Sequence, residues 1–244
     1  MMASATVGEA SDLARHTVEL LLTVPDAITP RQLSNTFWAY AKLAFSDCPL
    51  LDVLASSSMR RSREFGPQGL SNTVWSFAVL VMNNGPLLNA LSAASQLTMH
   101  HFDAQNLSNT SWSYSTISVQ DLPLMTALAS CSLCKISTWR SQELVNTFWS
   151  FAKLSISDVP LMDAISSASL RLLCQFSPQD LASTAWSLSA VQIWNTPLLT
   201  ALAPASIATM SEWEPRHLSI TAWSWAAVGL RDRPLLSAIS SSAI

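Results

Sequence analysis

Hydrophobic and polar positions recur along the chain with a period of 37 residues. Each copy carries a tryptophan, with a threonine two residues before it, a leucine five residues before it and a proline eleven residues after it. The six tryptophans are Trp38, Trp75, Trp112, Trp149, Trp186 and Trp223. A fixed period of this length predicts an array of stacked helical repeats, because one short repeat cannot bury its apolar surface alone.

Each repeat is expected to contain two helices. The first begins near a proline such as Pro30, where a missing first-turn N–H costs nothing, and extends to about Phe45 in the first copy. Asp103 and Ser177 are expected to cap first helices. The second helix is expected to begin where Asp or Asn stands two residues before a proline, the pattern of an N-cap with a first-turn proline. These caps are Asp47, Asn84, Asp121, Asp158, Asn195 and Asp232, and the aromatics expected to mark the turn into the next repeat are Phe65, Phe102, Trp139, Phe176 and Trp213.

The first helix is apolar on two sides. In the first copy, a helical wheel places Leu33, Thr36, Tyr40 and Leu43 on one side and Trp38 on nearly the opposite side. A helix of this kind is expected to be sandwiched between neighbours. We therefore predict that the six tryptophans pack in the core or between repeats, and that the threonine hydroxyls bond back along the helix.

The predicted fold is all-α, a right-handed α-solenoid of six 37-residue helix-turn-helix repeats. The repeats occupy residues 28–244, and the last is expected to be incomplete. Residues 1–27 are expected to supply one divergent helix that caps the front of the array.

Composition narrows the class of protein. Hydrophobic residues make up 49% of the chain, which excludes intrinsic disorder, and the net charge of −3 excludes a strongly basic protein that coats nucleic acid. The longest apolar run, Phe77–Met82, is far shorter than the ~20 residues of a membrane span. The N-terminus lacks the features of a targeting peptide. We expect no membrane association.

The sequence contains none of the common motifs of catalytic or cofactor-binding sites. Phosphate-binding loops, dinucleotide fingerprints, zinc-protease motifs and nucleophile elbows are all missing. Cys131 and Cys134 form a C-x-x-C inside a predicted second helix, without a second pair at zinc-finger spacing, and are expected to be small buried thiols. The sequence therefore predicts no catalytic residue, no metal site and no cofactor.

Two repeats carry a family resemblance. FGPQGLSNTVWSFA at 65–78 and FSPQDLASTAWSLS at 176–189, each followed by the Asp/Asn-x-Pro-Leu-Leu pattern, resemble octotricopeptide-type repeats. These are similar in turn to the helical repeats of FAST-kinase-like and RNA-editing substrate-binding-complex proteins. The resemblance covers residues 28–244. It implies sequence-selective binding of single-stranded RNA in mitochondria or plastids, with roles in transcript processing, stability or translation and with other RNA-processing proteins as further partners.

Polar positions of the first helix are the candidate RNA contacts. Seven residues before each tryptophan stand Arg31, Gln68, Gln105, Gln142, Gln179 and Arg216; three before stand Asn35, Asn72, Asn109 and Asn146, then Ser183 and Ile220; one after stand Ala39, Ser76, Ser113, Ser150, Ser187 and Ser224; four after, Lys42 and Lys153 add positive charge. We expect these spacings to line one helical face. Amide and hydroxyl groups on such a face can read base edges or bind ribose and phosphate.

The position six residues before each tryptophan varies most among the copies. It holds Gln32, Gly69, Asn106, Glu143, Asp180 and His217. A sequence code needs variable positions beside constant ones, so this position is the first candidate for base specificity.

Three alternatives stay open at this point. The asparagines could form a buried ladder between repeats in place of an RNA-binding row. The cluster Arg60, Arg61 and Arg63 is interpreted as a solvated helix end, with a phosphate contact as the second interpretation. The whole solenoid could be a protein–protein scaffold, which the acidic balance and the low lysine count favour.

Overall fold

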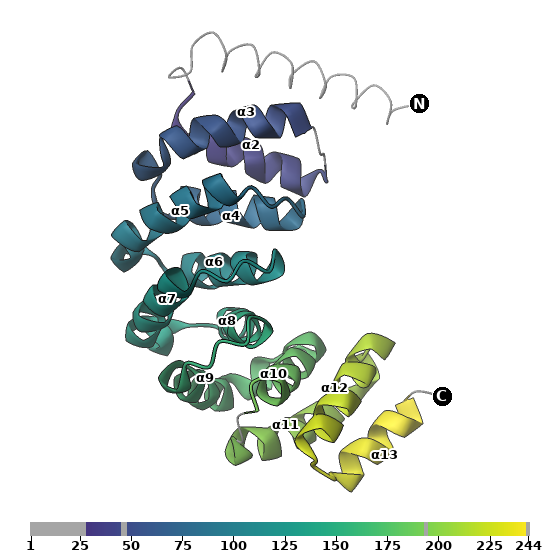
Figure 1. The fold of residues 1–244 in the computed structure, drawn as a ribbon. Coiled ribbons are helices and arrows are strands. Elements are labelled where there is room, and N and C mark those ends of the chain that lie inside the picture. Colours follow the sequence, from purple (N-terminus) through teal and green to yellow (C-terminus); the bar gives the residue numbers. More distant parts are fainter. Residues whose placement is uncertain (1–27, 45–47, 193–194, 243–244) are drawn as a thin grey trace, which may run out of the picture. The chain divides into compact units, whose positions relative to one another are not determined.

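The computed structural model describes residues 28–44, 48–192 and 195–242 of the chain. Within these ranges the secondary structure is helical throughout, and none of the described residues lies in a β-strand (Figure 1). This confirms the all-α class. The helix expected within residues 1–27 lies outside the described residues. The chain divides into two compact units, Met1–Phe102 and Asp103–Ile244.

Unit 1 contains two helical hairpins, each followed by a single turn of 3-10 helix. Its elements are α2 (Pro30–Lys42), α3 (Cys48–Arg60), η1 (Ser62–Glu64), α4 (Pro67–Val79), α5 (Gly85–Thr98) and η2 (Met99–His101). The first helices α2 and α4 pack against each other, as do the second helices α3 and α5. Phe37 and Phe77 join α2 to α4, with their ring centroids 5.0 Å apart.

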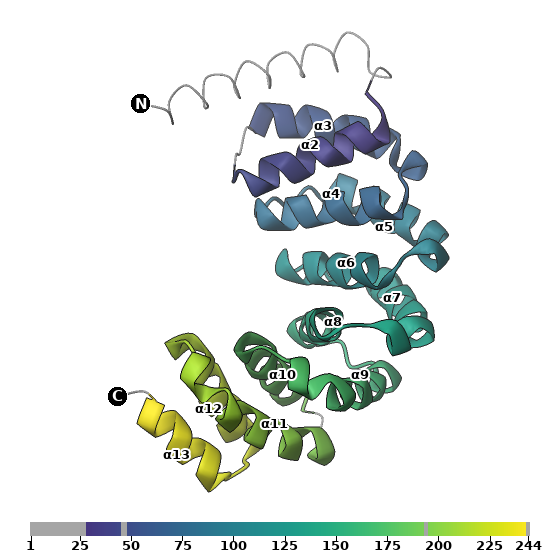
Figure 2. The ribbon, with the colours of Figure 1, turned by 180° about the vertical axis from the view of Figure 1, so that it is seen from behind.

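Unit 2 contains four further hairpins. Its elements are α6 (Ala104–Thr116), α7 (Leu122–Lys135), η3 (Ile136–Thr138), α8 (Ser141–Lys153), α9 (Val159–Leu172), η4 (Leu173–Gln175), α10 (Pro178–Ala190), α11 (Thr196–Ala208), η5 (Met210–Glu212), α12 (Pro215–Val228) and α13 (Arg233–Ser242). Within this unit the first helices α6, α8, α10 and α12 pack one on the next, and the second helices α7, α9, α11 and α13 form a second layer (Figures 1 and 2). Stacked hairpins in two helical layers are consistent with an α-solenoid.

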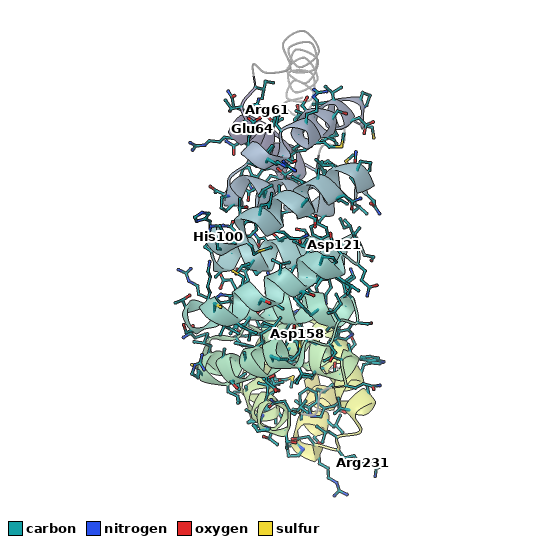
Figure 3. The ribbon with its side chains drawn as sticks, turned by 60° about the vertical axis from the view of Figure 1, so that its left-hand side comes forward. Arg61, Glu64, His100, Asp121, Asp158 and Arg231 are labelled. Atoms are coloured by element: carbon teal, nitrogen blue, oxygen red, sulfur yellow. The ribbon has the colours of Figure 1, made fainter. Side chains whose placement is uncertain are left out.

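The predicted helix starts are found in the structure. The side chains of Asp103 and Ser177 accept hydrogen bonds from the N–H groups three residues ahead, at the starts of α6 and α10. Asp121 and Asp158 do the same at the starts of α7 and α9, each at 3.0 Å (Figure 3). The remaining described caps of second helices are Asn84, Asn195 and Asp232. Asp47 lies outside the described residues.

An aromatic side chain closes each single-turn 3-10 helix. Phe65, Phe102, Trp139, Phe176 and Trp213 follow these turns, and all five are buried. Their backbone is extended, so the chain leaves one hairpin and enters the next at these positions. The prediction that these aromatics mark the turns is confirmed.

A left-handed residue follows the end of every first helix, and only one of the six is glycine. These residues are Ala44, Val81, Ser118, Ser155, Gln192 and Gly229, with φ between 50° and 71°. Each closes the helix with backbone bonds, as where Met82 N–H donates to the Phe77 carbonyl at 2.9 Å. A β-branched residue is strained in this conformation, so Val81 is held there by the surrounding hairpin.

Candidate nucleic-acid interface

One face of the first helices is accessible to solvent. It consists of the positions seven and three residues before each tryptophan, the tryptophan itself, and the position four after; in α8 these are Gln142, Asn146, Trp149 and Lys153. Steps of four, three and four residues keep these positions within about 60° of one another on a helix of 3.6 residues per turn. We call this face the first-helix stripe.

The rest of a first helix that has first helices on both sides is largely covered. In α8, the residues Leu144, Phe148 and Phe151 are fully buried, because α8 packs on α6, α10 and its own second helix α9. In unit 2 the first helices lie on the inner side of the curved stack and the second helices on its outer side (Figure 2). The stripe is the one face of α8 that these three neighbours leave uncovered.

The tryptophans were predicted to pack in the core or between repeats, and none of the six is fully buried, although Trp149 and Trp186 do contact each other between neighbouring repeats. Trp38 is 45% exposed and Trp223 is 55% exposed, while Trp75, Trp112, Trp149 and Trp186 are partly exposed. The prediction took both apolar sides of the first helix to be covered by neighbours. Helical geometry decides otherwise, since the line through the Gln and Asn positions continues through the tryptophan.

The prediction is also wrong for the serines one residue after the tryptophans, which are more buried than expected. Ser76, Ser113, Ser150, Ser187 and Ser224 were expected on the polar face, and all five are buried. They lie about 100° around the helix from the tryptophan, at the border with packed neighbours. Each hydroxyl donates to the carbonyl four residues earlier, as from Ser113 to Asn109 at 2.6 Å. Their small size suits a close helix contact.

The Gln and Arg positions are all exposed. They are Arg31, Gln68, Gln105, Gln142, Gln179 and Arg216. Arg216 forms an ion pair with Glu214, with Nε 2.9 Å from the carboxylate oxygen. These side chains place donors and acceptors at the N-terminal end of the stripe.

The asparagines do not form a hydrogen-bonded ladder. Asn35 is exposed and Asn72, Asn109 and Asn146 are partly exposed. Within the described part of the chain their side-chain amides make no hydrogen bond, although the backbone carbonyls of Asn72, Asn109 and Asn146 accept the serine hydroxyls. The amides are therefore available to a ligand.

The two lysines of the stripe lie over its tryptophan rings. In unit 1, Lys42 Nζ is 5.7 Å from the ring centroid of Trp38 and 5.2 Å from that of Trp75. In unit 2, Lys153 Nζ is 4.8 Å from the ring centroid of Trp149 and donates to the Thr116 carbonyl at the end of α6 at 3.3 Å. These distances are those of cation–π contacts.

The variable position serves the helix N-termini. Gln32, Glu143 and Asp180 each accept a hydrogen bond from the backbone N–H three residues before them, at 2.8, 2.9 and 3.0 Å. His217 Nδ1 accepts from Glu214 N–H in the same way at 3.3 Å. Any side chain with an acceptor at suitable reach can fill this capping role, which accounts for much of the variation at this position.

Two members of the variable position differ from the others. Asn106 is buried, and its N–H donates to Asp103. Gly69 has no side chain, and a Cβ at this position would lie 3.1 Å from the Phe65 ring. A cleft of about 590 Å³ lies here between the N-terminal ends of α2 and α4, and its lining includes Arg31, Asn35, Gln68 and Asn72 from the stripe.

Two members of the arginine cluster, Arg60 and Arg61, bond to other residues of the fold. Arg61 donates to the Ile28 carbonyl at 2.6 Å and pairs with Glu64 at 2.7 Å (Figure 3). The hydrogen bond from Arg61 lowers the pKa of the Glu64 carboxyl. Arg60 reaches Ser57 at 3.3 Å.

The threonine and cysteine predictions hold only in part. Thr36, Thr73 and Thr184 donate to the carbonyl four residues earlier, as predicted. Among the described residues the buried hydroxyls of Thr110, Thr147 and Thr221 have no hydrogen-bond partner, so the prediction is wrong for these copies. Cys131 is partly exposed and Cys134 is exposed, which corrects the expectation that both are buried thiols; Cys134 lies next to the last residue of α7.

Two absences apply to the described ranges. No helix there combines the length and the apolar character that crossing a membrane requires. The same ranges contain no cluster of His, Cys, Asp or Glu side chains that could hold a metal ion.

Comparison with known proteins identifies the family. None of the curated proteins compared with the chain matches it. The family model described as RNA-editing substrate-binding complex 6 protein matches residues 10–233, which is most of the chain and includes every first helix that carries the stripe. The chain therefore belongs to the RNA-editing substrate-binding complex 6 protein family.

Proposed function

We propose that this chain binds single-stranded RNA through the first-helix stripe. Membership of its family gives it a role in RNA editing within an RNA-binding complex, with RNA and protein partners. The observation that carries the proposal is the alignment, on one exposed helical face, of amides without internal partners beside accessible rings and lysines. Single-stranded RNA presents unpaired base edges to such amides, whereas duplex RNA withholds them.

The charge of the chain limits the form of binding. With a net charge of −3 and few cations on the stripe, we expect two to four phosphate contacts and a shallow dependence of affinity on salt. Lys42, Lys153, Arg31 and Arg216 are the cationic candidates. Affinity should come mainly from base and sugar contacts.

Finer features of the function belong to this proposal. We expect one nucleotide per 37-residue repeat and at least six nucleotides in all, on the right-handed, six-repeat solenoid that the sequence predicts. The resemblance to octotricopeptide-type and FAST-kinase-like repeats supports action in mitochondria or plastids, in RNA processing, stability or translation. The chain is proposed to act by binding, without catalysis of its own.

Fluorescence anisotropy at ~100 mM salt tests the proposal. Single-stranded 12-nucleotide RNAs of varied sequence should bind more tightly than a duplex of the same length. The double variant Asn109→Ala, Asn146→Ala should weaken binding about tenfold, because both amides are available to ligand. Gln175→Ala, which removes an exposed amide from η4 outside the stripe, is the matched control. Absence of binding below about 10⁻⁴ M contradicts the proposal.

Base preference is proposed to depend in part on the variable position. Glu143→Gln keeps an acceptor for the Arg140 N–H and removes only the charge. It should therefore change which base is preferred at one position of the RNA while leaving helix stability nearly unchanged. If wild type and Glu143→Gln show the same base preference across the RNA library, the role of Glu143 is restricted to capping.

A protein-scaffold role is the second candidate, and one observation favours it. In unit 2, Leu133, Leu170 and Ile207 lie 37 residues apart on α7, α9 and α11, and each is more than one-third exposed. A row of exposed aliphatic side chains is typical of a protein interface. Leu170→Asp should then abolish binding to a protein partner without affecting RNA.

A further inference from the structure

We propose that the tryptophans of the first-helix stripe are a stacking platform for the bases of the bound RNA. This inference rests on the proposed function and assigns the main contact within it. Its starting point is that the largest apolar side chains of the stripe stay in contact with solvent in every copy. Leaving a tryptophan half exposed forgoes a large part of the free energy that its burial would contribute.

Among the described residues, the tryptophan side chains outside the stripe are buried. Trp139 at a turn is 4% exposed, and Trp225, two residues after a stripe tryptophan, is 2% exposed. Trp223 on the same helix α12 is 55% exposed. The accessible rings are therefore a property of the stripe and do not follow from any difficulty in packing an indole.

Two of the stripe rings contact each other. Trp149 and Trp186 are neighbours on α8 and α10, with ring centroids 6.3 Å apart and an angle of 40° between their planes. Their helices pack directly on each other. A ring that is already positioned loses little conformational freedom when a base stacks on it, which favours binding.

Lysine placement points to nucleic acid as the occupant. The whole chain has three lysines, and two of them, Lys42 and Lys153, lie over stripe tryptophans. An aromatic face beside a cation matches the base and the phosphate of one nucleotide, the combination that single-strand binding proteins use. An apolar protein segment on the same stripe would desolvate the lysines and the asparagine amides without providing partners for them.

The test compares normal RNA with an RNA in which several bases are removed and the phosphates kept. Trp149→Leu and Trp186→Leu should each lower affinity for normal 12-nucleotide RNA by about 5- to 150-fold. Trp149→Phe should restore most of it, because a smaller aromatic face remains. On abasic RNA, wild type and both leucine variants should bind equally weakly, since no base is left to stack.

Trp139→Phe is the matched control, because it reduces an indole ring that lies outside the stripe. Circular dichroism and the urea unfolding midpoint establish that each variant is folded. If wild type binds RNA and the leucine variants bind it equally well, the stacking inference is overturned and the proposed function stands. If wild type binds no RNA, both are overturned, and the stripe is left to a protein partner.

Discussion

Tryptophan side chains differ in exposure between the stripe and the turns that join the hairpins. Trp139 and Trp213 at the turns are buried, whereas Trp38 and Trp223 on the stripe are about half exposed. The difference teaches that position on the framework, more than hydrophobicity, decides which large side chains enter the core. The aromatic side chains at the turns are buried, while a first helix such as α8 has one face that its neighbours leave uncovered.

The largest effect should come from removing a buried turn ring. Trp139→Ala is expected to lower the free energy of unfolding by about 3–5 kcal/mol, as for other large-to-small core changes. Trp112→Ala on the stripe should cost only ~1–2 kcal/mol, because its ring is partly exposed. Urea unfolding followed by circular dichroism measures both. Equal losses of unfolding free energy in Trp139→Ala and Trp112→Ala would contradict the distinction between the turns and the stripe.

The buried serine row gives the next largest effect. Ser113→Leu places a large side chain at a fully buried position and should cost about 1–3 kcal/mol by overpacking. Ser113→Ala should stay below ~1 kcal/mol, since the Asn109 carbonyl that loses the hydroxyl is still a helix acceptor. Thermal unfolding of the pair checks this. If Ser113→Leu does not lower the stability, Ser113 lies on a solvent-exposed face and the account is wrong at this position.

Removing backbone strain at the end of a first helix should give a smaller effect, an increase in the stability of the fold. Val81 is 84% exposed with φ of 55°, so Val81→Gly loses almost no packing and removes an unfavourable backbone conformation. Relief of about 1–2 kcal/mol for the left-handed residue, less the 0.5–1 kcal/mol entropic cost of glycine, predicts a net gain of up to ~1 kcal/mol. Gly229→Ala, at the equivalent position, should be destabilising, and the midpoints of urea unfolding should move in opposite directions.

The smallest expected effect is a pH dependence at His217. Burial and then the charge of Arg216 lower its pKa below the ordinary value of 6.5, although Glu214 opposes the shift. The unfolded chain therefore binds more protons than the folded chain just below that value, so stability is complete above it and falls as pH decreases. Gln32 fills the same capping role in α2. His217→Gln should therefore keep the cap and reduce the loss of stability between pH 7.5 and pH 5.5; an unchanged profile contradicts this.

Much of the fold could be predicted from the sequence because its signals are local. The N-caps Asp103 and Ser177 and the Asp/Asn-x-Pro starts of second helices depend on a few neighbouring residues. The left-handed helix ends could not be found this way, because only Gly229 among the six carries the glycine signal. In the others the conformation comes with the backbone hydrogen bonds that close the helix, such as that from Met82 N–H to the Phe77 carbonyl.

The candidate site was predicted correctly in its Gln/Arg and Asn rows and wrongly in its serine and tryptophan rows. Spacing alone leads from Gln142 through Asn146 to Trp149, but a tryptophan reads as core when hydrophobicity is given more weight than position. Capping at the variable position had a visible signal, since Thr29 and Gln32 have the spacing of a capping box. Which face the neighbours cover depends on how repeats stack, and a single helical wheel does not contain that information.

Ultraviolet cross-linking of a single-stranded RNA to the chain, with the attached peptides mapped by mass spectrometry, tests the central claim most directly. If RNA lies along the first-helix stripe, cross-links should concentrate on peptides that contain Trp149, Lys153 and Trp186. Trp139 and the second helices that carry Leu133 and Leu170 should remain unmodified. Cross-links confined to the second helices, from an RNA that binds tightly, would contradict the account and assign the binding surface to the opposite layer.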